Sequence, residues 1–151
     1  MFMSEIKHSF FNLTPDTILT SVEEALGVRA TGRVIALNSI ENRVYQIELE
    51  EEQNQDEDKP STWVVAKFYR PLRWTEKQIL DEHLFLRKLQ EAEIPAVAPL
   101  TLQNQSTLHK GTDGILFTVF PKTAGRMKDE LSARELRTLG RYLARIHSVA
   151  S

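Results

Sequence analysis

The feature that most constrains this chain is a lysine set into a strand that is apolar on both faces. Residues 62–69, TWVVAKFY, read as a strand, in which alternate side chains point to opposite faces of a sheet. One face carries Val64, Ala66 and Phe68, and the other carries Trp63, Val65, Lys67 and Tyr69. Apolar residues on both faces indicate a central strand, where an ammonium group buried alone would cost several kcal/mol. Lys67 therefore needs a partner.

The following helix supplies a candidate partner. Residues 75–92 read as a helix with Thr75 as its N-cap. Glu82 falls at helical spacing with three apolar residues, Ile79, Leu86 and Leu89. The sequence thus places a carboxylate on the face that should be buried, and two buried opposite charges are best accommodated by contact with each other. We therefore pair Lys67 with Glu82, either as a structural salt bridge or as part of a ligand site.

Composition narrows the class of protein. The 151 residues suffice for one domain with a core, and the net charge of -2 gives no sign of a nucleic-acid or anionic-membrane partner. The absence of cysteine excludes disulfides and thiolate chemistry. No apolar run is long enough to span a bilayer, and the N-terminal segment lacks the pattern of a signal peptide. We expect a cytoplasmic protein that binds neither nucleic acid nor membranes.

The chain before this stretch reads as a lead-in, a helix and a hairpin. Residues 1–13 are expected to pack on the domain through Phe10, Phe11 and Leu13. A capping threonine, a proline at the first position and a terminal glycine predict a helix over residues 15–26. Residues 29–37 and 43–50 read as the two strands of the hairpin, joined by a polar turn.

An acidic segment separates this hairpin from the lysine strand. Residues 48–61 are rich in glutamate and aspartate and show no apolar periodicity, which is typical of a solvated loop. The hairpin and the lysine strand then give three antiparallel strands in chain order.

After the long helix the sequence returns to strands. The prolines at 95 and 99 predict an extended connector over residues 94–99. Residues 100–102 could pair with 107–109, and a turn at 111–114 leads into a buried strand at 115–120. The fold class is therefore α+β, with an antiparallel sheet of about five strands, a long helix across it, and one further helix at each end of the chain.

The last helix carries an apolar stripe with no evident cover. Ser132 and Glu135 form a capping box at its start. Its stripe consists of Leu136, Leu139, Gly140, Leu143 and Ile146. We expect this stripe to be covered by a continuation of the chain or by a partner, which includes self-association.

Five segments of the sequence are distinctive when taken together: LNSIENRVY at 37–45, VVAKFYRP at 64–71, RWT at 73–75, ILDEH at 79–83 and GRYLARIH at 140–147. With them the chain resembles the bacterial stress response kinases, a group of Ser/Thr protein kinases within the aminoglycoside phosphotransferase and choline kinase superfamily. The resemblance covers nearly the whole chain and implies a kinase-like small lobe that binds ATP.

The resemblance also assigns roles to residues. Lys67 would hold the α- and β-phosphates of ATP, and Glu82 would hold Lys67. The turn at residues 38–42 would close over the nucleotide, with Ser39 as the most direct phosphate contact and Glu41 and Asn42 beside it. Val65 would help to wall the adenine, and residues 118–121, including Thr118 and Phe120, would form the hinge that meets the adenine edge. An ordinary polar turn and an apolar strand interior remain the alternative interpretations of these two segments.

One part of the family pattern is missing. The superfamily places its catalytic base and metal-binding carboxylates in a second lobe, within and after a His-Gly-Asp segment. None of His8, His83, His109 and His147 is followed by Gly-Asp. We therefore expect residues 1–121 to be the ATP-binding lobe and 122–151 the connector and first helix of a large lobe that is missing here. Neither catalytic residues nor metal ligands are predicted in this chain, so Mg²⁺ would be bound by the missing lobe and the chain alone would be inactive.

Three functions remain open at this stage. The first is the nucleotide-binding lobe of an ATP-dependent Ser/Thr protein kinase of the stress response, acting in the full-length enzyme on a protein substrate. The second is the corresponding lobe of a small-molecule kinase of the aminoglycoside, choline or homoserine type. The third is a non-catalytic interaction module that binds through its last helix.

Overall fold

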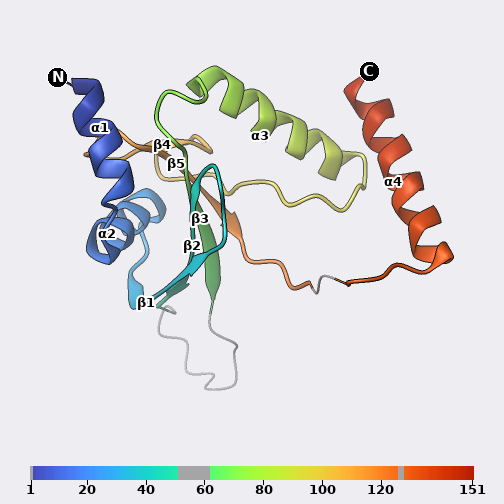
Figure 1. Ribbon diagram of the computed structural model, residues 1–151, viewed down its shortest axis with the longest axis horizontal. Coiled ribbons are helices and arrows are strands. Elements are labelled where there is room, and N and C mark those ends of the chain that lie inside the picture. Colours follow the sequence, from blue (N-terminus) through green and yellow to red (C-terminus); the bar gives the residue numbers. More distant parts are fainter. Residues whose placement is uncertain (1, 51–61, 126–127) are drawn as a thin grey trace.

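The computed structural model describes residues 2–50, 62–125 and 128–151. A five-stranded antiparallel sheet with the strand order β1-β2-β3-β5-β4 is the centre of the fold (Figure 1). Helices α1 and α2 lie on one side of it, α3 passes over the other side, and α4 stands apart from the sheet (Figure 1). The elements are α1 (Phe2–Phe11), α2 (Pro15–Leu26), β1 (Ala30–Leu37), β2 (Arg43–Leu49), β3 (Trp63–Phe68), α3 (Glu76–Glu91), β4 (His109–Lys110), β5 (Leu116–Pro121) and α4 (Ala133–Ala150). The predicted fold class is confirmed.

Helix α2 begins and ends at the residues that the sequence indicates. The Thr14 hydroxyl accepts a hydrogen bond from the Thr17 amide at 3.2 Å, which satisfies one free donor of the first turn. Gly27 ends the helix with a φ of 70°, a left-handed conformation that glycine adopts without steric cost. The buried face of α2 carries Ile18, Val22 and Ala25 into the core.

The N-terminal segment differs from its prediction because it is a helix rather than an irregular lead-in. Helix α1 has no capping signal in the sequence, so it depends on packing with the rest of the domain. Phe10 is buried in the core and Leu13 packs against it, as expected. Phe11 is exposed, although the Arg70 guanidinium lies over its ring.

Strands β1, β2 and β3 lie side by side in chain order, as predicted. The core lies on the α2 side of the sheet, where alternate residues of the strands are buried: Tyr45, Ile47, Leu49, Val64, Ala66, Phe68, Phe117 and Val119. Strand β2 extends into the segment predicted as a solvated loop, because Glu48 is buried and binds Arg33 at 3.1 Å. The rest of that prediction, from residue 51 to residue 61, lies outside the described residues.

The segment between α3 and β5 contains one strand, β4, whereas the sequence predicts that two short strands could pair there. The predicted pairing of residues 100–102 with 107–109 is wrong as a strand ladder, because the Leu100 amide donates to the Val119 carbonyl of β5. The short strand β4 instead pairs with β5, and the turn from Gly111 to Gly114 connects the two strands. Leu100 thus bonds to the edge of β5, a long-range contact that local sequence does not encode, while the Leu102 amide donates to the Ser106 carbonyl of the adjacent turn.

Helices α3 and α4 both begin with a capping box. In α3 the Thr75 hydroxyl accepts from the Gln78 amide while the Gln78 side chain accepts from the Thr75 amide. Ser132 and Glu135 form the same arrangement in α4. These reciprocal bonds fix where each helix starts, so the register of Glu82 and of the leucine stripe follows from the caps.

Candidate functional site

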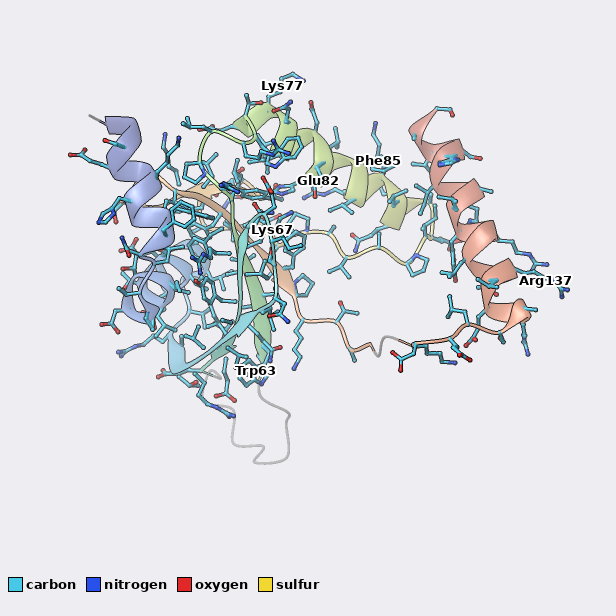
Figure 2. The ribbon with its side chains drawn as sticks, viewed as in Figure 1. Trp63, Lys67, Lys77, Glu82, Phe85 and Arg137 are labelled. Carbon is cyan, nitrogen blue, oxygen red and sulfur yellow. The ribbon has the colours of Figure 1, made fainter. Side chains whose placement is uncertain are left out.

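The two charges that the sequence pairs do meet in the structure. Lys67 Nζ on β3 lies 3.7 Å from Glu82 Oε1 on α3, and Figure 2 shows the two side chains in the space between strand and helix. The pair is not buried, however, because the side chains of Lys67 and Glu82 are 24% and 51% exposed. The prediction that Glu82 lies on the buried face of α3 is wrong: that face carries Ile79, His83 and Leu89. Burial alone therefore does not explain the pairing.

Lys67 keeps capacity to bind a further group. A separation of 3.7 Å is longer than a normal N–H···O hydrogen bond, and an ammonium group has three protons to donate. The Tyr69 ring lies 4.9 Å from Lys67 Nζ and provides a face that attracts the cation. The ammonium is thus located by a carboxylate and an aromatic ring while remaining available to an anionic ligand.

The strand register shows which side chains share a face with Lys67. Directly paired residues of antiparallel strands lie on the same face of a sheet. Lys67 is paired with Val44 on one side and Thr118 on the other, and Val65 is paired with Gln46 and Phe120. Residues Leu37 and Ile35 of β1 continue the same rows. We call this surface the open face; it consists of Ile35, Leu37, Val44, Gln46, Val65, Lys67, Thr118 and Phe120.

The open face combines one cation with an apolar surface. Ile35 and Leu37 are exposed, and Val44, Val65 and Phe120 are partly exposed. Apolar side chains beside an ammonium group offer contacts to an aromatic ring and to phosphates of one ligand. Val65 and Phe120 are among the site residues predicted from the sequence, whereas Ile35, Leu37 and Val44 are not. Their alternation within the predicted hairpin strands could have revealed them.

The turn at residues 38–42 adjoins the open face. It connects β1 with β2, and Val44 of β2 is the strand partner of Lys67. Its polar side chains are largely engaged in holding the turn. Ser39 Oγ accepts from the Asn42 amide at 3.3 Å, and Asn42 Oδ1 accepts from the Arg70 amide at 3.3 Å. Glu41 binds Arg73 Nε at 2.9 Å. Ser39 is exposed and its hydroxyl proton can still be donated, so a phosphate contact from Ser39 stays a prediction.

Strand β5 presents the predicted hinge. The Thr118 side chain is fully buried and donates to the Thr107 carbonyl at 2.6 Å, so its hydroxyl does not face a ligand. The Val119 carbonyl is also engaged, since it accepts the Leu100 amide at 2.8 Å. Phe120 lies on the open face opposite Val65. A backbone contact from residues 118–121 to an adenine stays a prediction, and Phe120 is the member of this segment whose side chain is best placed.

A hydrogen-bonded pair that the sequence analysis omits lies next to the charged pair. The Tyr69 hydroxyl and His83 Nε2 are 3.0 Å apart, and both side chains are buried. Burial, and secondarily the charge of Glu82, raises the pKa of Tyr69 well above its usual range. Burial also lowers the pKa of His83, an effect that Glu82 opposes and Lys67 reinforces. The neighbouring tyrosine and histidine are therefore neutral at pH 7.

The described residues offer neither a metal cluster nor a membrane span. Among them, no three histidine, cysteine, aspartate or glutamate side chains gather in a way that could hold a metal ion. No helix within residues 2–50, 62–125 and 128–151 is both long and apolar enough to cross a bilayer.

Comparison with known families shows the family to which the chain belongs. A profile of the phosphotransferase enzyme family matches residues 33–151, which include every residue of the open face. The chain belongs to the phosphotransferase enzyme family. The resemblance drawn from the sequence motifs is confirmed.

Relatives in this phosphotransferase family carry kinase names. Stress response kinase A of Escherichia coli strain K12 is 40% identical over 145 residues, which cover 96% of this chain and 40% of that protein. Stress response kinase A of Shigella flexneri is 38% identical over 145 residues, with the same coverage of both proteins. The serine/threonine protein kinase RdoA of Salmonella typhimurium is 37% identical over 145 residues, again covering 96% of this chain and 40% of that protein. The chain thus spans about 40% of the length of the curated relatives that it matches.

A solved structure supports the fold of this phosphotransferase chain. The amicoumacin kinase hAmiN, in complex with AMP-PNP, Ca2+ and Ami, aligns with a TM-score of 0.68 at 20% sequence identity. The alignment covers 89% of this chain and 39% of that chain. The fold is therefore that of a kinase-like small lobe, in which the lysine strand and the glutamate helix hold the positions that the sequence predicts.

Proposed function

We propose that this chain is the ATP-binding small lobe of a Ser/Thr protein kinase of the stress response type. The single observation that carries the proposal is the partly exposed Lys67 ammonium, held 3.7 Å from Glu82 on an apolar open face. A structural salt bridge alone does not account for the free apolar surface beside it. Membership of the phosphotransferase family and the names of the relatives support the same activity.

Each part of the site would have a separate task. Lys67 would bind the α- and β-phosphates, and Glu82 would keep the ammonium in place. Val65 and Phe120 would lie against the adenine, and Ser39 would donate to a phosphate from the turn. ATP supplies the phosphoryl group when bound.

The catalytic groups would belong to a large lobe. We propose that residues 1–121 form the nucleotide lobe and 122–151 the connector and first large-lobe helix. In this family the acceptor is oriented by a base and Mg²⁺ is held by carboxylates, but the described residues gather no metal-binding cluster. No metal-dependent step is therefore assigned to this chain. It should bind ATP weakly and give no metal-dependent phosphorylation in a kinase assay.

The acceptor and the setting are also proposals. The relative that is named a serine/threonine protein kinase favours a protein acceptor, and the cytoplasm is the setting that we propose. The fold shared with amicoumacin kinase favours a small-molecule acceptor as the second candidate. A third candidate is a binding module that acts through α4, because Leu136, Leu139 and Leu143 are exposed on that helix.

The test is ATP binding by a lysine variant. Ligand binding stabilises a folded protein by RT ln(1 + [L]/Kd), or about 2.7 kcal/mol at a hundredfold excess over Kd. Thermal unfolding should therefore shift upward with ATP in the natural protein and not in Lys67→Ala. Lys77→Ala is the matched control, because Lys77 also pairs with an acid on α3, Asp81, but points into solvent (Figure 2).

The two interpretations of Lys67 give opposite results. If Lys67 serves nucleotide binding, Lys67→Ala loses the response to ATP while Lys77→Ala keeps it. If the pair is purely structural, Lys67→Ala lowers the unfolding temperature by the same amount with and without ATP, and the proposal is wrong.

A further inference from the structure

Three hydrogen bonds link Tyr69, His83 of helix α3, Thr107 and Thr118 of strand β5. The first involves the Tyr69 hydroxyl, which lies 3.0 Å from His83 Nε2. The other ring nitrogen, His83 Nδ1, lies 2.7 Å from the Thr107 hydroxyl. The Thr107 carbonyl then accepts the Thr118 hydroxyl at 2.6 Å. His83 therefore uses both ring nitrogens to join three separate parts of the chain.

The Tyr69 end of this set of hydrogen bonds reaches the proposed ligand site. The ring of Tyr69 lies 4.9 Å from the Lys67 ammonium, at a distance where the aromatic face attracts the cation. Tyr69 is the first residue after β3, and its amide donates to the Leu116 carbonyl of β5. With its backbone bonded to β5 and its hydroxyl bonded to His83, the axis of the Tyr69 ring is located at both ends. The ring that faces the cation is thereby kept in place, and burial of the side chain limits its rotation about that axis.

His83 is buried and packed, so it can hold the Tyr69 hydroxyl in place. The residue is 3% exposed, and its ring lies edge-on to Phe120 at 6.4 Å. Because burial keeps the imidazole neutral, it adds no positive charge beside Lys67. Both ring nitrogens have a partner, as a buried imidazole requires, so His83 is located by two polar contacts as well as by packing.

We propose that His83 is a positioning residue for Lys67, acting through the Tyr69 ring to fix where the ammonium lies on the open face. The inference rests on the proposed function, since it concerns the same site. It adds a second device to the Glu82 pair. Glu82 attracts the ammonium from above, while Tyr69 and His83 determine its location on the sheet.

The first experiment observes Lys67 directly and needs no nucleotide. In protein labelled with ¹³C at the lysine Cε, the Lys67 resonance, assigned with Lys67→Arg, should be displaced by the ring current of Tyr69. His83→Phe retains an aromatic ring but removes both polar contacts, and Tyr69→Phe removes only the hydroxyl. Both variants should move the Lys67 resonance toward that of an exposed lysine.

A matched control separates positioning from general disturbance. His109→Phe changes a second histidine, which is partly buried and packs on Phe117 of β5. This variant should leave the Lys67 resonance in place. If His83→Phe does not fold, Tyr69→Phe decides alone, since it removes one oxygen atom. A Lys67 resonance unchanged in every folded variant overturns the inference.

The second measurement connects positioning to binding. Losing one hydrogen bond of this kind changes a free energy by about 0.5–1.5 kcal/mol, so ATP affinity should fall about two- to twelvefold in Tyr69→Phe. It should fall at least as much in His83→Phe, which loses two such bonds, and stay unchanged in His109→Phe. Unchanged affinity in variants whose Lys67 resonance has moved would also overturn the inference. If the natural protein itself does not bind ATP, the proposed function fails, and the resonance alone then judges whether His83 positions Lys67.

Discussion

At the scale of single residues, the solvent exposure of the Lys67–Glu82 pair decides what it contributes to stability. The glutamate is 51% exposed, and ion pairs in contact with water typically contribute about 0–1 kcal/mol. Glu82→Gln should therefore lower the free energy of unfolding in urea by less than about 1 kcal/mol while weakening ATP binding. Asp81→Asn, which alters the adjacent exposed pair, should leave ATP binding unchanged. A loss of several kcal/mol in Glu82→Gln would instead indicate a desolvated pair.

His83 should make the protein sensitive to acid. Burial, opposed by Glu82 and reinforced by Lys67, lowers its pKa below the usual value of 6.5. The unfolded chain then binds a proton more readily than the folded one, so stability present above about pH 6.5 is lost as the pH falls toward the lower folded pKa. The difference in unfolding temperature between pH 7.5 and 5.5 should shrink in His83→Phe. His147→Phe, at an exposed position on α4, should leave that difference unchanged.

These two residues also show how far sequence can reach at this scale. The charged pair is predictable, because a lysine on a central strand must meet an acid and the next helix offers one. The sequence does not predict whether Glu82 or His83 lies on the buried face of α3, since a helical repeat of 3.6 residues allows either position. The structure buries His83 because Tyr69 and Thr107 give its nitrogens partners. Those partners lie on other elements and are brought together only by folding.

At the scale of elements, Gly27 and Gly140 have opposite effects on the helices that contain or precede them. Gly27 ends α2 at a φ of 70°, and a Cβ there would lie 2.7 Å from Gln103 Nε2, which donates to the Leu26 carbonyl. Gly27→Ala should destabilise the fold by about 1–2 kcal/mol, because the left-handed conformation penalises a side chain. Gly140 lies within α4 with open space around it, so Gly140→Ala should stabilise that helix by about 0.5–1 kcal/mol. Urea unfolding followed by circular dichroism measures both changes.

The elements themselves were predictable where local chemistry defines their ends. Helix α2, helix α4 and the start of α3 follow from caps and glycine, and β1 to β3 follow from alternation and a turn. Helix α1 was missed because it has no capping signal and is stabilised by the burial of Phe10. The path of residues 100–102 was mistaken because Leu100 bonds to the edge of β5 rather than to the nearby chain. Both errors arise where distant contacts outweigh local preference.

At the scale of the whole molecule, α4 is joined to the rest of the fold through few contacts. Arg145 donates to the Ala92 and Glu93 carbonyls at 2.7 and 3.2 Å, at the C-terminal end of α3, where a positive charge is favourable. Figure 1 shows α4 standing apart from the sheet. Leu136, Leu139 and Leu143 are between 52% and 56% exposed. This stripe is the largest apolar feature of α4 that has no cover.

An uncovered stripe of this kind should promote association between copies of the chain. Burying three leucine side chains in a shared interface removes apolar surface from water at about 25 cal/mol per Å², which favours a dimer over the monomer. Light scattering after size-exclusion chromatography should show a species larger than the monomer whose fraction rises with concentration. Leu139→Arg should shift the protein to the monomer, whereas Arg137→Glu, at a position that points away from the domain (Figure 2), should not. A monomer at every concentration would show that the leucine stripe of α4 does not mediate self-association.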